Sequence, residues 1–400
     1  MHLNRRQFIA ASSVMAAAAT SVSGVEKKKY KACIIGDSKM GGYGHCIQYA
    51  FALQDDVATV ALADPDESGR TRHAKEVGVE RTYADYREML EKERPDLVAV
   101  APRCTVNHKD YMLACAAAGA HGFIEKPFCD DLSNGDEMVA AIEAKKLKWS
   151  IAFNFRGMPL VQHAKRLVEK GLIGTVLEAR GRGKEDRRAG GEDLIVLGAH
   201  VLDLMRFFMG GSPIWCTADV TDKGHASTAA TVRQATEPLG PIVGDRVHAM
   251  YGFPNGVVGY FDSMLNPDGN GGRFGIDICG SRGILSIRIL AGDSTVRVQF
   301  LDKSTWSDGG WKPLPDAPSV EMKDPHRERN RIITDDLIAA IEEDRRPAFS
   351  VQDGLASWEM TQAVFDSCVQ GGRVAIPLKN RKHPLDSWTR SEKGHEGDRP

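Results

Sequence analysis

The sequence lacks the cysteine pairs that a zinc site or a disulfide framework requires. Its eight cysteines stand apart in apolar surroundings without a C-x-x-C pair, a pattern typical of small buried side chains. We therefore expect no metal site. Lysine and arginine form no long block, and the formal net charge is −2. The basic surface that nucleic-acid binding needs is missing as well, so nucleic acid is not an expected partner.

A long hydrophobic run is also missing beyond the N-terminus. Residues 1–24 join a charged start to an alanine-rich segment that is too short for a comfortable membrane span. The pair Arg5 and Arg6, followed by QFI, resembles a twin-arginine export signal, although Asn4 stands where that signal usually has Ser or Thr. We expect a signal peptide over residues 1–24 and a periplasmic mature protein without a stable membrane anchor.

The composition is that of an ordinary globular protein. The 400 residues are 42% hydrophobic and 26% charged, and this length allows two domains of common size. Short apolar runs alternate with helical stretches in the first third, which favours a doubly wound parallel sheet. We predict an α/β domain over residues 28–148, with strands near residues 30–36, 57–64, 96–102 and 121–125.

After residue 148 the pattern changes to a series of β-rich runs. Tight glycine and asparagine turns join many of them, and such turns favour antiparallel pairing. We predict a second α/β domain over residues 149–378 with a large, mostly antiparallel sheet. Residues 379–400 are polar and are expected to form a loose tail. Helices are expected near residues 159–170, 193–209, 327–344 and 351–370.

The loop after the first strand, GDSKMGGYGH, has the composition of a phosphate-binding turn. Helical spacing follows it over residues 41–54, and Ser38 replaces the middle glycine of G-x-G-x-x-G. Asp64 ends the second strand, 20 residues beyond Gly44. This spacing is typical of the acid that binds the ribose hydroxyls of NAD and repels a 2′-phosphate. The pattern predicts a crevice for NAD, with NADP as the alternative, lined by Gly36, Ser38, Gly41, Gly42 and Asp64.

Two further stretches carry candidate catalytic residues. Lys126 follows the apolar run that ends the fourth predicted strand, and ligands of open α/β sheets lie at the carboxyl ends of strands. Along the helix expected over residues 193–209, Asp193, His200 and Asp203 share a stripe beside the apolar face. A lone histidine there is more often a core residue, but an acid three residues later favours a functional one.

Together these motifs resemble the Gfo/Idh/MocA oxidoreductases, the family of glucose-fructose oxidoreductase and inositol 2-dehydrogenase. The resemblance covers about residues 30–378. It implies a Rossmann domain, a C-terminal domain whose open sheet forms a homo-oligomer interface, a bound NAD or NADP, and a small carbohydrate substrate. It rests on the glycine loop, ALADPDESG, Pro102 with His108, EKP at 125–127, NFR at 154–156, GAHVLD at 198–203 and DGLASWEMTQAVFDSCVQGGRVAIPL.

The resemblance also implies roles for single residues. Pro102, His108 and Glu125 would join the cofactor site. Lys126 would lie beside the nicotinamide and the reacting hydroxyl, and His200 would be its acid/base partner. The resemblance also adds Asp203 to the catalytic set and Arg156, in NFR, to the substrate site. Two further candidates for the substrate site are Lys184, in the polar segment before the helix, and Asp193, on the stripe of His200.

One position departs from the family pattern. Many of these dehydrogenases have an aspartate four residues before the histidine, and here that residue is Val196. Asp193 is the nearest carboxylate on the same stripe and could replace it only if the helix dips into the crevice. The polar segment around Lys184 is either a sugar-binding rim or ordinary solvated surface.

The residues therefore predict an exported NAD-dependent oxidoreductase acting on a sugar, polyol or glycoside. Free NAD is scarce outside the cytoplasm, so such an enzyme is expected to keep its cofactor bound and to regenerate it in a closed redox cycle. Transient oxidation that loosens a glycosidic bond is one alternative. A non-catalytic sugar-binding or cofactor-binding module that kept the fold is another, because function depends on the site.

Overall fold

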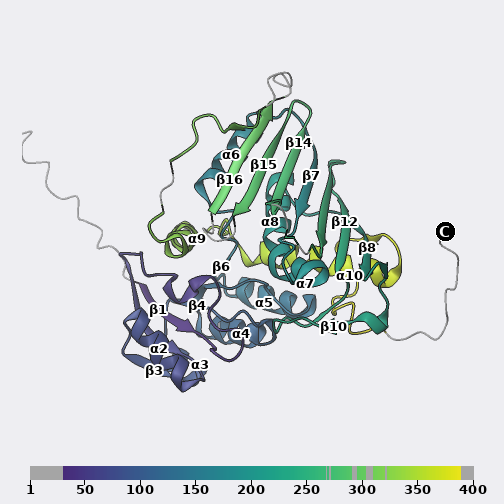
Figure 1. Cartoon of the computed structure of the whole chain (residues 1–400). Coiled ribbons are helices and arrows are strands. Elements are labelled where there is room, and N and C mark those ends of the chain that lie inside the picture. Colours follow the sequence, from purple (N-terminus) through teal and green to yellow (C-terminus); the bar gives the residue numbers. More distant parts are fainter. Residues whose placement is uncertain are drawn as a thin grey trace, which may run out of the picture.

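The computed structural model describes residues 30–266, 268–269, 272–290, 295–302, 310–319 and 322–388. Figure 1 shows a first domain, in purple and blue, built on a parallel sheet, and a larger sheet that stands above it. The predicted signal peptide over residues 1–24 lies outside the described residues. No helix within them is long and apolar enough to cross a membrane.

The first sheet is parallel throughout, as predicted. Its strand order is β3-β2-β1-β4-β5-β6, and β1 pairs in parallel with both β2 and β4. The strand order therefore switches between β1 and β4: β2 and β3 extend the sheet on one side of β1, and β4, β5 and β6 extend it on the other. Open α/β sheets bind ligands at such a switch point. The strands are β1 (Tyr30–Ile35), β2 (Val57–Ala63), β3 (Arg81–Tyr83), β4 (Leu97–Val100), β5 (His121–Ile124) and β6 (Trp149–Ile151).

Helices cover this sheet, and several begin at an aspartate that caps the first turn. Asp66 accepts a hydrogen bond from the Gly69 amide and Asp131 accepts one from the Asn134 amide, which satisfies backbone donors that the first turn leaves unpaired. The helices are α2 (Glu67–Val77), α3 (Tyr86–Glu93), the short 3-10 helix η2 (Thr105–Asn107), α4 (His108–Ala118) and α5 (Leu132–Ala144).

The segment after the glycine loop differs from the prediction. Helical spacing over residues 41–54 predicts a full helix, but the structure has only the 3-10 helix η1 (Gly44–Tyr49). Within it His45 and Cys46 have left-handed φ values of 44° and 55°. A Cβ on Gly44 would collide with the Glu125 carboxylate, so the backbone bends here against the end of β5. Such strain persists only where surrounding contacts impose it.

The second sheet has ten strands and is mostly antiparallel, as predicted. Its order is β17-β16-β15-β14-β7-β13-β12-β8-β18, with β9 paired to β8, and only β13 and β7 pair in parallel. A separate small hairpin consists of β10 (Arg233–Gln234) and β11 (Pro241–Ile242). The strands of the large sheet are β7 (Val176–Arg182), β8 (Trp215–Asp222), β9 (His225–Ala226), β12 (Arg246–Gly252), β13 (Val258–Met264), β14 (Gly275–Gly280), β15 (Gly283–Leu290), β16 (Thr295–Asp302), β17 (Lys312–Pro313) and β18 (Val374–Ala375).

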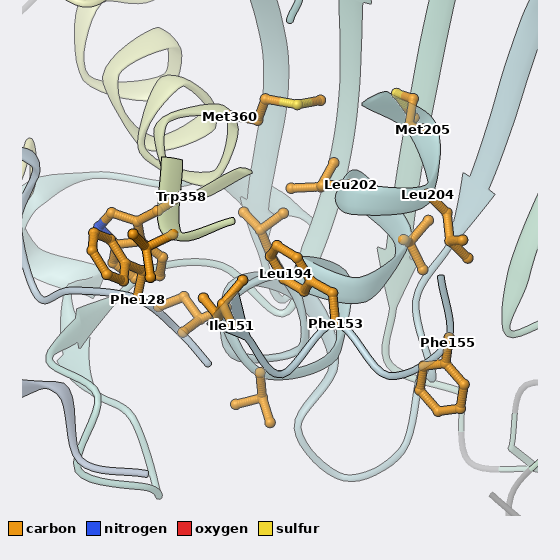
Figure 2. Close-up of a cluster of buried hydrophobic side chains, with 14 of the residues drawn as sticks. Phe128, Ile151, Phe153, Phe155, Leu194, Leu202, Leu204, Met205, Trp358 and Met360 are labelled. Atoms are coloured by element: carbon orange, nitrogen blue, oxygen red, sulfur yellow. The ribbon is translucent and has the colours of Figure 1, made fainter. Parts of the chain in front are cut away.

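Helices α8 and α10 pack between the two sheets. Helix α10 contacts β8 and α8 on one side and β6 and α5 on the other. Figure 2 shows the shared core, where Phe128 of the first domain lies near Trp358 of α10 and Leu194 lies near Phe153. This packing holds the two domains against each other. The remaining helices are α6 (Pro159–Glu169), α7 (Ala189–Asp193), the π-helix η3 (Leu194–Gly198), α8 (Ala199–Met209), the 3-10 helix η4 (Ala229–Thr231), α9 (Pro325–Glu342) and α10 (Val351–Gln370).

Two predicted boundaries need correction. Strand β6 pairs with β5, so the first sheet runs to Ile151, beyond the boundary predicted at residue 148. The tail predicted to be loose from residue 379 is held in place over its described part, residues 379–388, because Arg381 forms ion pairs with Asp136 of α5 and Glu359 of α10. Leu385 is buried. Long-range ion pairs and burial therefore hold residues 379–388 against both domains.

Candidate active site

Lys126 lies at the carboxyl end of β5, where it meets η3 of the second domain. Its side chain is 5% exposed, and its Nζ donates a hydrogen bond to the backbone carbonyl of Val196 over 2.8 Å. Burial lowers the pKa of Lys126 below its usual range, and the nearby Glu125 and Glu237 charges act against that shift. A lowered pKa makes the amine of Lys126 easier to deprotonate than that of an exposed lysine, which suits a general base.

The Val196 carbonyl can accept the hydrogen bond of Lys126 because the helix geometry changes locally. The helix predicted over residues 193–209 divides into α7, the π-helix η3 and α8. In a π-helix the hydrogen bonds span five residues instead of four, a feature common at functional sites. The residue that replaces the family aspartate thus contacts Lys126 through its backbone, a contact that its apolar side chain gives no reason to expect.

His200 lies on α8 and completes the buried centre. It is 2% exposed, and neither ring nitrogen has a hydrogen-bond partner among the described residues. Burial lowers its pKa well below the ordinary value, and the charges of Lys126, His45 and Arg329 add to the effect. The imidazole is therefore neutral. A buried ring with two unsatisfied nitrogens is costly for folding alone, so its polar atoms fit a bound ligand.

His45 is a site residue that the sequence reading missed. Its Nδ1 lies 2.6 Å from one oxygen of Glu125, and its ring meets His200 edge to face at 5.3 Å between centroids. Burial raises the pKa of Glu125, but the charge and hydrogen bond of His45 offset it and leave that pKa below the ordinary value. Its place directly after the glycine loop was the one available signal.

Asp203, predicted to act with His200, has a different partner. Its Oδ2 lies 3.2 Å from Arg156 Nε in a buried ion pair, and Asp353 lies 3.2 Å from the other end of the same guanidinium. Burial raises the pKa of Asp203 to about 7, with Arg156 opposing. Arg156 is itself 5% exposed. The predicted substrate arginine and catalytic aspartate therefore form an internal charge cluster with α10.

Asp193 and Lys184 also lie apart from Lys126 and His200. Asp193 is buried and accepts hydrogen bonds from Ser263 Oγ at 2.6 Å and from the Glu185 amide at 3.0 Å. Its carboxylate fixes the loop before α7 and does not replace the missing aspartate. Lys184 pairs with Asp186 at 3.4 Å on that loop. The π-turn changes the direction of Asp193 relative to His200, which a regular helical repeat does not predict.

His108 links two backbone segments on the cofactor-binding side of the first domain. It is fully buried, with Nε2 2.8 Å from the Pro102 carbonyl and Nδ1 3.0 Å from the Phe128 carbonyl. Burial lowers its pKa, and the two carbonyls oppose that shift because a neutral ring can donate to only one of them. These contacts tie the segment after β4 to the segment after β5 and thereby hold the backbone on both sides of Lys126.

The predicted dinucleotide residues lie together at the ends of β1 and β2. Asp64 accepts hydrogen bonds from Ser38 Oγ at 2.7 Å and from the Tyr43 hydroxyl at 3.0 Å. A Cβ on Gly36 would collide with the Tyr43 phenol, which therefore lies directly on the loop backbone. Beside Asp64 a cavity of about 270 Å³ opens, lined by Gly36, Asp64, Pro65, Tyr86 and Tyr111 among others.

This arrangement fits a dinucleotide. The Asp64 carboxylate already accepts hydrogen bonds from two hydroxyl groups, as it would from the hydroxyl groups of a ribose. Tyr86 and Tyr111 line part of the neighbouring cavity. Gly41 has a left-handed φ of 88°, and a Cβ there would lie 2.7 Å from the Cys104 amide nitrogen, so the loop backbone can stay close to the end of β4 only with glycine. The Tyr43 hydroxyl would compete with a ribose hydroxyl for Oδ2 of Asp64.

Comparison with known proteins agrees with this assignment. Residues 30–153 match an oxidoreductase family with an NAD-binding Rossmann fold, and residues 161–286 match the GFO/IDH/MocA C-terminal domain. The protein is thus an NAD-dependent oxidoreductase. It belongs to the Gfo/Idh/MocA family, as its motifs predicted.

Curated relatives cover much of the chain. Levoglucosan dehydrogenase of Pseudarthrobacter phenanthrenivorans is 26% identical over 357 residues, or 80% of this chain and 89% of that protein. D-apiose dehydrogenase of Paraburkholderia graminis is 31% identical over 58% of this chain and 60% of its own length. A solved structure of levoglucosan dehydrogenase with NADH and levoglucosan shares the fold, with TM-score 0.70, 22% identity, and coverage of 88% of this chain and 100% of that one.

Proposed function

We propose that this protein oxidises a hydroxyl group of a small sugar or polyol with NAD as the hydride acceptor. The observation that carries the proposal is the buried pair of a lysine with lowered pKa and a neutral histidine whose two nitrogens are unpaired. Relatives named for levoglucosan, D-apiose and myo-inositol support the substrate class.

The side chains divide the proton handling between them. Burial lowers the pKa of Lys126 and so favours its neutral amine form more than in an exposed lysine. One N–H of Nζ donates to the Val196 carbonyl, which leaves the lone pair free to take the proton of the reacting hydroxyl. His200 can then donate a hydrogen bond to a neighbouring hydroxyl of the substrate, or accept one from it. Bound NAD supplies the acceptor for the hydride that leaves the same carbon. Gly36, Ser38, Gly41, Gly42 and Asp64 would hold it.

A substrate panel tests this function. Wild-type protein loaded with NAD is mixed with sugars, polyols and glycosides, and nicotinamide absorbance is followed over a single turnover. We expect reduction by at least one sugar or polyol. Absence of reduction across the panel, with NAD demonstrably bound, would instead favour a binding module that kept the fold.

We further propose that the protein is exported by the twin-arginine route and retains its NAD, so that one substrate regenerates the cofactor for the next. Support comes from Arg5 and Arg6 at the start of an alanine-rich segment. Replacing both arginines by lysine is expected to block export without affecting folding. Unchanged export would point to the general secretory route and weaken the case for a preloaded cofactor.

The outer face of the large sheet is the proposed homo-oligomer surface. It carries a broad hollow of about 940 Å³ lined by residues of β8, β12 and β13, including Asp219, His248 and Asp262. Light scattering of the purified protein tests this proposal. A tryptophan at Thr217, a residue that also lines this hollow, is expected to shift the mass to that of the monomer.

A further inference from the structure

The imidazole of His200 has no hydrogen bond that fixes its orientation. Both of its ring nitrogens are buried and lack a partner among the described residues. In a functional histidine, the hydrogen bond of one nitrogen ordinarily sets the tautomer and holds the ring. Because His200 has no such bond, the plane of its ring depends on the side chains that pack against it, and both nitrogens stay open to a substrate.

Three aromatic side chains in the described part of the chain pack against this ring. The ring of His200 lies 4.8 Å from Phe155 and 6.4 Å from Phe153, measured between centroids. It lies 5.3 Å from the ring of His45. All three contacts are edge to face, an arrangement that is favoured because the positive edge of one ring meets the negative face of the other. Phe153 and Phe155 lie on the segment after β6 (Figure 2), whereas His45 belongs to η1, so two separate segments hold the ring.

His45 is itself held by both its side chain and its backbone. Its Nδ1 lies 2.6 and 2.9 Å from the two oxygens of Glu125, a buried carboxylate. Asn330 of α9 donates from Nδ2 to the backbone carbonyls of His45, at 3.1 Å, and Cys46, at 3.2 Å. Both of these residues have left-handed φ values, which residues other than glycine keep only where surrounding contacts impose them. These hydrogen bonds together fix the ring that meets His200.

We propose that His45 is a positioning residue for the oxidation, which orients the ring of His200 and is itself anchored by Glu125. Many dehydrogenases of the family have an aspartate one helical turn before this histidine, where Val196 stands here. The carboxylate of this site acts instead from the end of β5 and through a second imidazole. This inference rests on the proposed function for its effect on turnover, whereas the contacts among the three side chains are independent of any substrate.

Replacing His45 by asparagine separates this role from simple pairing with Glu125. Asparagine Nδ2 stands as many bonds from Cα as histidine Nδ1, so it can still donate to Glu125, and asparagine tolerates a left-handed backbone well. What is lost is the aromatic ring that meets His200. We expect the rate of single-turnover reduction of bound NAD to fall by about 10²-fold, because a small misplacement of a reacting group has a cost of that size. The affinity for NAD should be retained.

The ring signals of His200 give a second readout that needs no substrate. In carbon–proton NMR spectra of ¹³C-labelled protein, the Cδ2–H and Cε1–H signals of His200 are assigned by their loss in His200→Ala. Wild type should give one sharp set, and in His45→Asn this set should shift and broaden as the ring gains freedom. His163→Asn is the matched control, because His163 also makes a hydrogen bond, with Nε2 2.8 Å from the Pro315 carbonyl, but lies on α6. It should change neither readout.

A second variant covers the case in which His45→Asn does not fold. Asn330→Ala keeps the ring of His45 and removes the donor to its backbone carbonyl, so it should change both readouts in the same direction by less. In a folded His45→Asn protein, wild-type turnover or unchanged His200 signals overturns the proposal, since pairing with Glu125 would then be the whole role of His45. A wild type that oxidises no sugar or polyol overturns the proposed function and leaves the NMR test standing.

Discussion

Replacing Asp203 by asparagine separates a structural role from a catalytic one. In the folded protein burial raises the pKa of Asp203 to about 7, whereas an unfolded aspartate titrates near pH 4. The folded state therefore binds more protons between these values, and stability falls as pH rises through that window. From about pH 5 to about pH 8 this single group accounts for a loss of roughly 2 to 3 kcal/mol.

The Asp203→Asn variant should lose most of this pH dependence. Urea unfolding followed by the fluorescence of the six tryptophans measures the free energy of unfolding across that range. Asp353→Asn is the matched control, because the pKa of Asp353 stays below its ordinary value despite burial, owing to Arg156 and Arg206. Because the Asp353 charge is one of the causes that raise the pKa of Asp203, removing it should move the slope to lower pH without abolishing it.

Activity gives the second readout for Asp203. Because its ion-pair partner is Arg156 and the charges acting on His200 are Lys126, His45 and Arg329, kcat of Asp203→Asn should stay within about tenfold of wild type. A fall of about 10² or more, combined with an unchanged pH slope of stability, would refute the structural role. It would restore Asp203 as the acid that acts with His200.

Three further outcomes are expected. Lys126→Met should fold and bind NAD while turnover falls by about 10² to 10⁴, measured as single-turnover reduction of bound NAD; intact reduction excludes its role as the base. His200→Ala should lose turnover similarly with NAD affinity retained, because the proposed reaction uses its unpaired nitrogens for the substrate. A loss of NAD affinity alone would place His200 at the cofactor. Tyr43→Phe removes a hydroxyl that competes for Asp64 and should tighten NAD binding by about fivefold, the equivalent of roughly 1 kcal/mol for one hydrogen bond. Calorimetric titration measures that change, and weaker binding would contradict the competition.

The amino-acid sequence by itself determined the elements whose signals are local. Buried parallel strands are nearly continuous apolar runs, so β1, β2, β4 and β5 could be read directly, as could the position of Lys126 at a strand end. Helix α10 was predicted with its observed bounds, Val351–Gln370, because apolar periodicity persists over its full length and a glycine follows it.

Only the tertiary structure decided which side chains meet. The π-turn brings the Val196 carbonyl to Lys126, and no side-chain pattern reports a backbone acceptor. Asp203 and His200 share a predicted stripe, yet Asp203 pairs with Arg156 because the free energy of a buried charge depends on its nearest counter-charge and not on sequence spacing. Glu237, between β10 and β11, meets Arg188 before α7 and Arg103 of the first domain. Such long-range contacts leave no periodic trace in the chain.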